Sequence, residues 1–246
     1  MHMTPSDTDL IYSNPHSQVK DFKFDAQVVE VFPDMISRSV PGYNTIIDTI
    51  GRLSKQYAQD NSTIYDLGCS LGAATLAMRK AITAKNCHII GIDNSAAMVE
   101  RCKMHVQAFK GAIPVDIMQA DIMEVDFKPA SMMVLNFTLQ FIEREHRQNL
   151  LTKIADNMLD NGILVLSEKI TQTDDVCQEV VTELHHNFKR ANGYSELEIA
   201  QKRTALENVM KPDTLDQQIN RLKQAGFKHV TPWFQCFNFT SLIAIK

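Results

Sequence analysis

The sequence lacks the features that would assign the chain to a membrane or to an export pathway. Its 246 residues contain no uninterrupted apolar run of the roughly 18 residues that a membrane-spanning helix needs. The first 20 residues are polar and have no apolar core of the kind found in signal peptides. These absences predict a cytoplasmic protein that makes no contact with a membrane.

Cysteine motifs and an excess of basic residues are also absent. The cysteines are odd in number and show no C-x-x-C spacing: Cys69, Cys87, Cys102, Cys177 and Cys236. This pattern favours a reducing compartment and predicts no bound metal. Lys and Arg total 25 against 29 Asp and Glu, which gives a net charge of −4. The balance argues against a dedicated nucleic-acid binder, and we expect no strong direct binding of nucleic acid.

What is present, from residue 63 onward, is an alternation of short apolar strands with helices. The predicted strands are 63–67, 87–92, 115–119, 132–136 and 163–167, with helices between them that include 73–82, 95–109 and 144–158. Helical connections of this length imply parallel strands, right-handed crossovers and helices on both faces of the sheet. Two last strands, 229–234 and 240–245, are expected to pair antiparallel. The fold class is therefore α/β and Rossmann-like, with a mostly parallel seven-stranded sheet.

The segments outside this alternation differ in character. Residues 1–20 are polar and are expected to form a mobile tail. Residues 21–58 are predicted to form a helical cap, interrupted by Pro41 and Gly42. Residues 171–210 contain two consecutive helices and are interpreted as a helical insertion. We therefore expect a tail followed by a single α/β domain over 21–246.

A glycine-rich turn follows the first predicted strand and precedes a helix. Its pattern is D-x-G-x-x-x-G, running from Asp66 through Gly68, Cys69 and Ser70 to Gly72. Glycine lets the backbone approach a ligand closely, and the helix that follows offers free N–H groups. This is the pattern with which class I methyltransferase folds cradle the methionine part of S-adenosylmethionine (SAM). The dinucleotide pattern G-x-G-x-x-G is absent. A turn that binds no ligand is the alternative interpretation.

Polar residues stand at the ends of the next three strands. Asp93 follows the second strand, about 25 residues after Gly68, which is the spacing of an acid that binds ribose hydroxyls. Asp121 follows the third strand, where this fold binds adenine, and Asn136 ends the fourth, which faces the reactive sulfonium. Each residue could instead cap a turn or helix. Because ligands bind at the carboxyl ends of such strands, the set together predicts a SAM site.

The helical insertion contains one arginine with an unusual predicted environment. Ser195 and Glu198 form a capping box that starts a helix, on which Ile199, Leu206 and Met210 would form an apolar stripe. Arg203 falls on the same stripe and must reach outward or meet an anion. A structural ion pair is the alternative. Two neighbouring pairs receive no ligand role: His185-His186 is not expected to share a metal, and Lys189-Arg190 is interpreted as a solvated face.

Blocks spread over nearly the whole chain resemble the carboxy-S-adenosyl-L-methionine synthase family. They lie at residues 31–36, 38–43, 66–75, 136–141, 188–195 and 233–239. The glycine motif is common to many methyltransferases, whereas the later blocks are long and specific. The resemblance implies an enzyme that converts SAM and prephenate into carboxy-SAM, with release of phenylpyruvate and water. It also implies a homodimer whose product supplies a tRNA carboxymethyltransferase that modifies the wobble uridine.

The resemblance further implies a set of ligand contacts. They are Tyr43, Gly68, Cys69, Ser70, Asp93, Asn94, Asp121, Ile122, Asn136 and Arg203. Arg203 would recognise the new carboxylate, because a guanidinium pairs with a carboxylate through two hydrogen bonds. No metal and no protein general base are assigned, since the hydroxide that prephenate expels can take up the methyl proton. An ordinary SAM-dependent methyltransferase and a non-catalytic SAM-binding partner of a tRNA-modifying complex are the alternatives.

Overall fold

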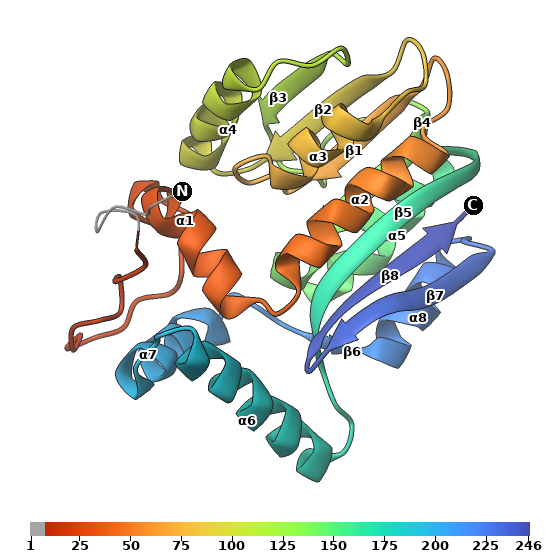
Figure 1. The fold of residues 1–246 in the computed structure, drawn as a ribbon. Coiled ribbons are helices and arrows are strands. Elements are labelled where there is room, and N and C mark those ends of the chain that lie inside the picture. Colours follow the sequence, from red (N-terminus) through yellow and green to blue (C-terminus); the bar gives the residue numbers. More distant parts are fainter. Residues whose placement is uncertain (1–7) are drawn as a thin grey trace.

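A twisted β-sheet forms the centre of the molecule, and helices cover it (Figure 1). The computed structural model describes residues 8–246. The strands are β1 (Thr63–Leu67), β2 (His88–Asp93), β3 (Val115–Gln119), β4 (Ala130–Asn136), β5 (Met158–Thr171), β6 (Asp213–Thr214), β7 (His229–Cys236) and β8 (Phe239–Ile245). Their order is β3-β2-β1-β4-β5-β8-β7, with β6 paired to β5. Strands β1 to β5 run parallel, and β8 is antiparallel to both β5 and β7.

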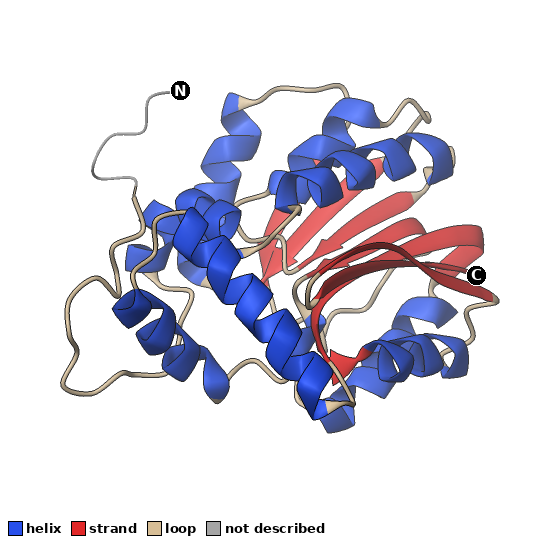
Figure 2. Ribbon diagram, turned by 60° about the horizontal axis from the view of Figure 1, so that its bottom comes forward, coloured by secondary structure: helices blue, strands red, loops and turns tan. Residues whose placement is uncertain are grey.

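The helices lie on both sides of this sheet (Figure 2). They are α1 (Ala26–Ser39), α2 (Tyr43–Tyr57), α3 (Ala73–Ala81), α4 (Ala96–Ala108), α5 (Arg144–Asp156), α6 (Asp175–Ala191), α7 (Glu196–Glu207) and α8 (Leu215–Gln224), with a short 3-10 turn at Leu139–Phe141. The predicted fold class is confirmed. Strand β6 was not predicted, because a two-residue strand carries no detectable periodicity. Helix α8 was not predicted either, although its capping box at Thr214 and Gln217 is a local signal for a helix start.

The apolar strands are buried on both faces. Within β4, Met133 packs into the cluster that α5 and α8 cover, whereas Met132 and Val134 pack into the cluster that α2 and α3 cover. Adjacent strand residues point to opposite faces, so a strand buried on both sides needs a continuous apolar run. The carboxyl ends of the parallel strands are consequently the place where the sheet can present polar groups. They point toward α1, α6 and α7 (Figure 1).

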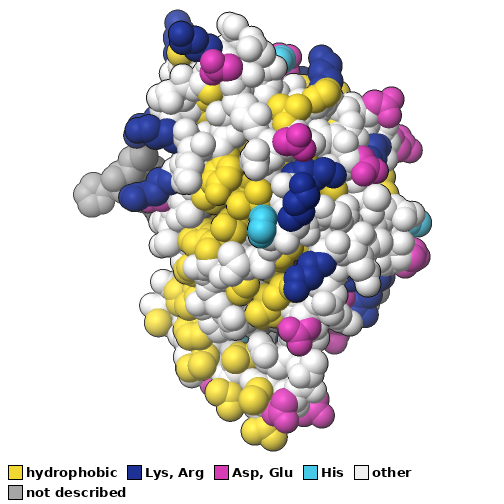
Figure 3. Space-filling view, turned by 90° about the vertical axis from the view of Figure 1, so that its right-hand side faces the viewer, with side chains coloured by type: hydrophobic (Ala, Val, Ile, Leu, Met, Phe, Trp, Pro, Cys, Tyr) yellow, Lys and Arg dark blue, Asp and Glu magenta, His cyan; other side chains and the backbone are white. Residues whose placement is uncertain are grey.

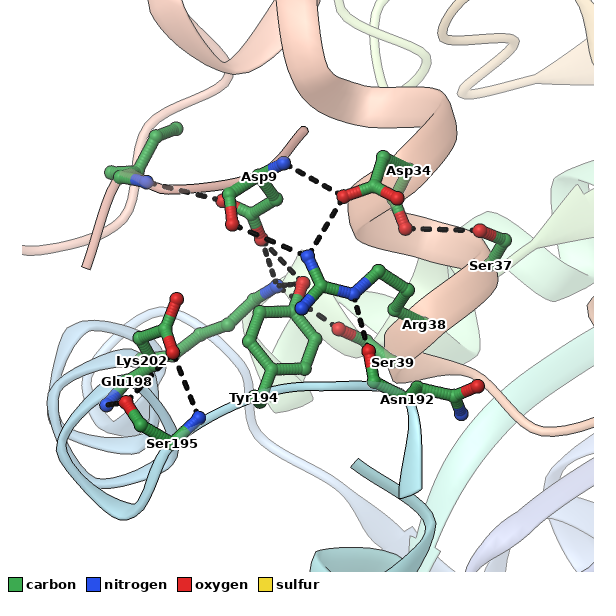
Figure 4. A network of polar contacts seen from close by, with 11 residues as sticks. Asp9, Asp34, Ser37, Arg38, Ser39, Asn192, Tyr194, Ser195, Glu198 and Lys202 are labelled. Carbon is green, nitrogen blue, oxygen red and sulfur yellow. Dashed lines mark hydrogen bonds and ion pairs between the residues drawn. The ribbon is translucent and has the colours of Figure 1, made fainter. Parts of the chain in front are cut away.

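The N-terminal segment differs from the mobile tail that the sequence predicts. Asp9 is only 1% exposed, and its backbone N–H donates to the Asp34 carboxylate at 2.7 Å. Its own carboxylate accepts hydrogen bonds from the Tyr194 hydroxyl and from Lys202 Nζ (Figure 4). Asp9 itself is therefore held by the protein, which the sequence does not predict, because a buried ion pair across 193 positions leaves no local sequence signal. Residues 1–7 lie outside the described residues.

Within residues 8–246, no helix is both long and apolar enough to cross a membrane. The same part of the chain holds no group of three His, Cys, Asp or Glu side chains placed to bind a metal ion.

Candidate functional site

A large cavity lies at the carboxyl ends of the parallel strands, between the sheet and helices α1, α2, α6 and α7. Its volume is about 560 Å³. All of the predicted ligand residues except Arg203 line it: Tyr43, Gly68, Cys69, Ser70, Asp93, Asn94, Asp121, Ile122 and Asn136. Residues that lie up to 93 positions apart in the sequence therefore meet at one site, as expected for strand ends that share one edge of a sheet.

The glycine-rich turn folds tightly onto the end of β2. The backbone N–H groups of Gly68 and Cys69 both donate to the carbonyl of Ile92, at 2.8 and 2.9 Å. Gly68 has a φ of +81°, and a Cβ at this position would lie 2.3 Å from Thr138 Oγ1. Only glycine fits this conformation and this close approach. The residues of this turn therefore line the cavity immediately before α3 begins.

The two acids that flank the turn have different surroundings. The Asp66 carboxylate is buried and accepts a hydrogen bond from the Thr75 hydroxyl, and burial raises the pKa of this carboxyl to about 6. Asp93 accepts the N–H of Ser70 on one oxygen and the N–H of Ser95 on the other, both at 2.9 Å. Burial raises the pKa of Asp93, and these N–H bonds oppose that effect. Each Asp93 oxygen keeps a further lone pair with which it can accept a ligand hydroxyl.

The end of β4 presents an unsatisfied polar group to the cavity. The Oδ1 atom of Asn136 is buried and accepts no hydrogen bond from any residue between 8 and 246. Buried oxygens of this kind normally have a partner, so a ligand donor is expected here. The next residue, Phe137, has a φ of +62°, and its ring lies 6.4 Å from that of Tyr43 between centroids. A non-glycine residue in this region often marks a functional site.

The third strand end is more open. Asp121 is exposed and its carboxylate accepts the N–H of Met123 at 2.9 Å, whereas Ile122 is buried and contributes apolar surface. An apolar wall beside a polar edge is suited to a flat heteroaromatic ring.

Arg203 does not line this cavity. It is exposed and borders a separate surface notch with His186 and Glu196. The predicted apolar stripe is wrong in detail, because α7 ends at Glu207 and Met210 lies beyond it. Neighbouring helix positions point about 100° apart, and it is Lys202 that faces the cavity. Arg203 also forms no ion pair with the described residues, so the structural alternative is not observed either.

Four Lys and His side chains that line the cavity were not predicted from the sequence: Lys169 of β5, His185 and Lys189 of α6, and Lys202 of α7. The solvated face predicted for Lys189 is wrong, since only 7% of this residue is exposed. A local signal exists, because His185 and Lys189 are four positions apart and so share one helix face. Nothing in the sequence shows that this face turns inward.

The fold and the lining of the cavity define a SAM-binding protein of the class I methyltransferase type. Residues 64–162 match the family described as "Methyltransferase domain". A solved O-methyltransferase family protein from Burkholderia thailandensis superposes with a TM-score of 0.67 at 14% identity, over 91% of this chain and 60% of that chain. Human N-acetylserotonin methyltransferase in complex with SAM gives a TM-score of 0.59 at 17% identity, over 90% and 55%. Likeness at these identities shows the fold alone.

Full-length relatives identify the family. The chain is 70% identical over 244 residues to the carboxy-S-adenosyl-L-methionine synthase of Colwellia psychrerythraea, covering 99% of this chain and all of that one. It is 58% identical over 238 residues to the enzyme of the same name from Pseudoalteromonas translucida, covering 97% and 98%. The chain therefore belongs to the carboxy-S-adenosyl-L-methionine synthase family, and the resemblance noted in the sequence is confirmed.

Proposed function

We propose that this protein converts SAM and prephenate into carboxy-SAM, with release of phenylpyruvate and water. The observation that carries the proposal is the 70% identity, over the full length, to a protein named for this product. The cavity supports it, because its strand-end residues provide the polar contacts that adenosine and methionine require.

The proposed reaction balances without a protein base. The ring of prephenate becomes aromatic as it loses carbon dioxide and hydroxide, which leaves phenylpyruvate. The hydroxide takes one proton from the sulfonium methyl group and becomes water. The methyl carbon then forms a bond to carbon dioxide, so the product carries a new carboxylate. What the chain must supply is binding, orientation and exclusion of bulk water.

Mass spectrometry of the ligand that the purified protein releases tests this proposal. We expect a species heavier than SAM by one carbon dioxide. An ordinary methyltransferase would instead transfer the methyl group to an acceptor and yield S-adenosylhomocysteine. A protein that only binds SAM would release it unchanged after incubation with prephenate.

The role that the resemblance assigns to Arg203 requires a second copy of the chain. Because Arg203 is exposed and outside its own cavity, we propose that it reaches the carboxylate in the cavity of a partner subunit. Apolar residues on α6 offer a surface for such a homodimer: Val176, Val180 and Leu184 are spaced by four and are 69%, 55% and 43% exposed. Figure 3 shows hydrophobic side chains gathered on one face of the molecule and continuing to its lower end, at the height of α6 in Figure 1.

Replacing Arg203 with alanine should weaken carboxy-SAM binding far more than SAM binding. A buried carboxylate that loses its partner costs about 2–5 kcal/mol, whereas the adenosine contacts lie on the strand ends. Arg203→Lys should recover only part of this loss, because an ammonium group cannot form the two-pronged pair. Titration calorimetry with both ligands is the measurement. Equal weakening of both ligands would show that Arg203 does not recognise the carboxylate.

A mixing experiment tests whether Arg203 acts across the dimer. An Arg203→Ala subunit keeps an intact cavity, and an Asp93→Ala subunit keeps an intact Arg203. After the two impaired variants are mixed and allowed to exchange subunits, activity at a low SAM concentration should rise above that of either variant alone. If Arg203 acts within its own subunit, or if no dimer forms, the mixture should be no more active than the separate variants.

Direct binding of tRNA is expected to be weak, since the net charge is −4 and the proposed product is a small molecule. We propose that the protein works in the cytoplasm and supplies carboxy-SAM to a separate tRNA carboxymethyltransferase. In a gel-shift assay at about 150 mM salt, nanomolar protein should give no specific tRNA complex. A specific complex under these conditions would contradict the separation of the two steps.

A further inference from the structure

One wall of the cavity is positively charged. Lys169, Lys189 and Lys202 come from three different elements, β5, α6 and α7, and all line the same space. Lys189 and Lys202 are 7% and 4% exposed. A cationic wall is unexpected beside a site for SAM, because the sulfonium is itself a cation and would be repelled. It indicates that an anion lies between the two charges when the site is filled.

The three lysines are not equivalent. The ammonium of Lys202 already has partners, since it donates to Asp9 at 3.2 Å and to Ser39 Oγ at 3.0 Å (Figure 4). The amino groups of Lys169 and Lys189 form no hydrogen bond and no ion pair with any residue in the described range 8–246. Lys202 is therefore committed to the protein, and the other two amino groups are available to a ligand.

Burial of the Lys169 and Lys189 amino groups without a counter-charge from the protein carries an electrostatic cost. Burial lowers the pKa of Lys169, and burial together with the charges of Lys202 and Lys169 lowers the pKa of Lys189 to about 7. An unpaired buried ammonium destabilises a folded protein, and replacement by an apolar side chain of similar volume is usually tolerated. A ligand that pairs with both groups would remove this cost.

Flat apolar surfaces connect the lysines with the end of β4. The ring of Phe239 lies 6.0 Å from that of Phe137 and 4.9 Å from that of His185 between centroids, edge to face in both cases. His185 Nε2 donates to the carbonyl of Ser39 at 2.8 Å, and burial lowers the pKa of this imidazole to about 3. The imidazole is therefore neutral and acts as a further ring surface. A ligand can thus place a hydrocarbon ring here and still reach Lys169 or Lys189.

We infer that Lys169 and Lys189, with the rings of Phe137, Phe239 and His185, form the subsite for the second substrate, a dicarboxylate with an unsaturated hydrocarbon ring. The lysines bind its carboxylates and the rings contact its apolar face. This inference rests on the proposed function, in which that substrate is prephenate. It adds residues that the resemblance did not assign, and it explains why the cavity extends beyond the contacts to SAM.

Binding of prephenate to protein loaded with S-adenosylhomocysteine tests the subsite without turnover, because that ligand has no methyl group to react. Titration calorimetry should show that Lys169→Met and Lys189→Met each weaken prephenate binding by about tenfold or more, as expected for loss of a charged hydrogen bond. Affinity for S-adenosylhomocysteine should stay unchanged. Lys189→Arg should restore part of the prephenate affinity. Lys103→Met, on the exposed side of α4, is the matched control and should behave as wild type.

Thermal unfolding supplies a readout that a structural lysine would not give. Removing a buried, unpaired charge should raise the melting temperature of ligand-free Lys189→Met, whereas removing a lysine that supports the fold would lower it. Wild-type prephenate affinity in both methionine variants would overturn the subsite while leaving the proposed function intact. If wild-type protein makes no carboxy-SAM from SAM and prephenate, the proposed donor fails, and the subsite as stated fails with it.

Discussion

Replacing Asp93 with alanine is expected to lower the affinity for SAM by at least tenfold while leaving the chain folded. Asp93 stands at the end of β2 and lines the cavity, and we propose that its two oxygens accept the hydroxyl hydrogens of the ribose. A hydrogen bond to a charged group contributes about 1.5–3 kcal/mol, so the loss of one already accounts for tenfold. The N–H groups of Ser70 and Ser95 would lose their acceptor as well, which loosens the glycine-rich turn.

Calorimetric titration of SAM against wild type, Asp93→Ala and Asp93→Asn measures this effect. Asparagine keeps one acceptor oxygen and the shape of the side chain, so its loss of affinity should be smaller than that of alanine. Asp48→Ala removes a carboxylate at an exposed position of α2 that does not line the cavity. It serves as the control, and its affinity for SAM should equal that of wild type. Unchanged SAM affinity in Asp93→Ala would remove Asp93 from the ribose site.

Replacing Asp213 with alanine is expected to destabilise the fold by about 3–5 kcal/mol, because a buried guanidinium would lose its counter-charge. Asp213 is 2% exposed, and its carboxylate pairs with Arg147 at 2.5 Å, Arg221 at 3.0 Å and Arg144 at 3.1 Å. Arg147 is fully buried. The cluster joins β6 to α5 and α8, so its loss should weaken the attachment of both helices to the sheet.

Urea denaturation of ligand-free protein gives the free energy of unfolding for this test. The matched control is Arg144→Ala, since the Arg144 side chain is 58% exposed and a surface pair is worth at most about 1 kcal/mol. A loss below about 1 kcal/mol in Asp213→Ala would mean that the buried arginine finds other partners, such as the carbonyls of Ile142 and Gln140 that it already contacts.

The sequence was sufficient for the central sheet and for the polar residues at the strand ends that line the cavity. A strand buried on both faces must be continuously apolar, as Met132 and its neighbours are. Such apolar runs allowed the strands to be identified in the sequence. Because the strands are parallel, their carboxyl ends share one edge of the sheet. The positions of Asp93, Asp121 and Asn136 at these ends therefore predict that all three line one site. Geometry alone brings them together, and no knowledge of the side-chain contacts was needed.

Contacts between distant segments could not be predicted in this way. Asp9 and Lys202 pair across the chain, and three arginines converge on Asp213 from separate elements. Neither arrangement has a period or a local motif. On α7, an error of one position in the helix face exchanges Lys202 for Arg203, because adjacent residues differ in direction by about 100°. The cationic wall was not predicted because Lys169, Lys189 and Lys202 come from three separate elements and share no local motif.

Analysis of the products formed from SAM and prephenate by the purified protein tests the central claim most directly. Liquid chromatography with mass spectrometry should show carboxy-SAM and phenylpyruvate appearing in equal amounts, with no S-adenosylhomocysteine. Both products should disappear when prephenate is omitted. Formation of S-adenosylhomocysteine together with a methylated acceptor, and no carboxy-SAM, would contradict the proposed reaction. It would show that the protein is an ordinary SAM-dependent methyltransferase.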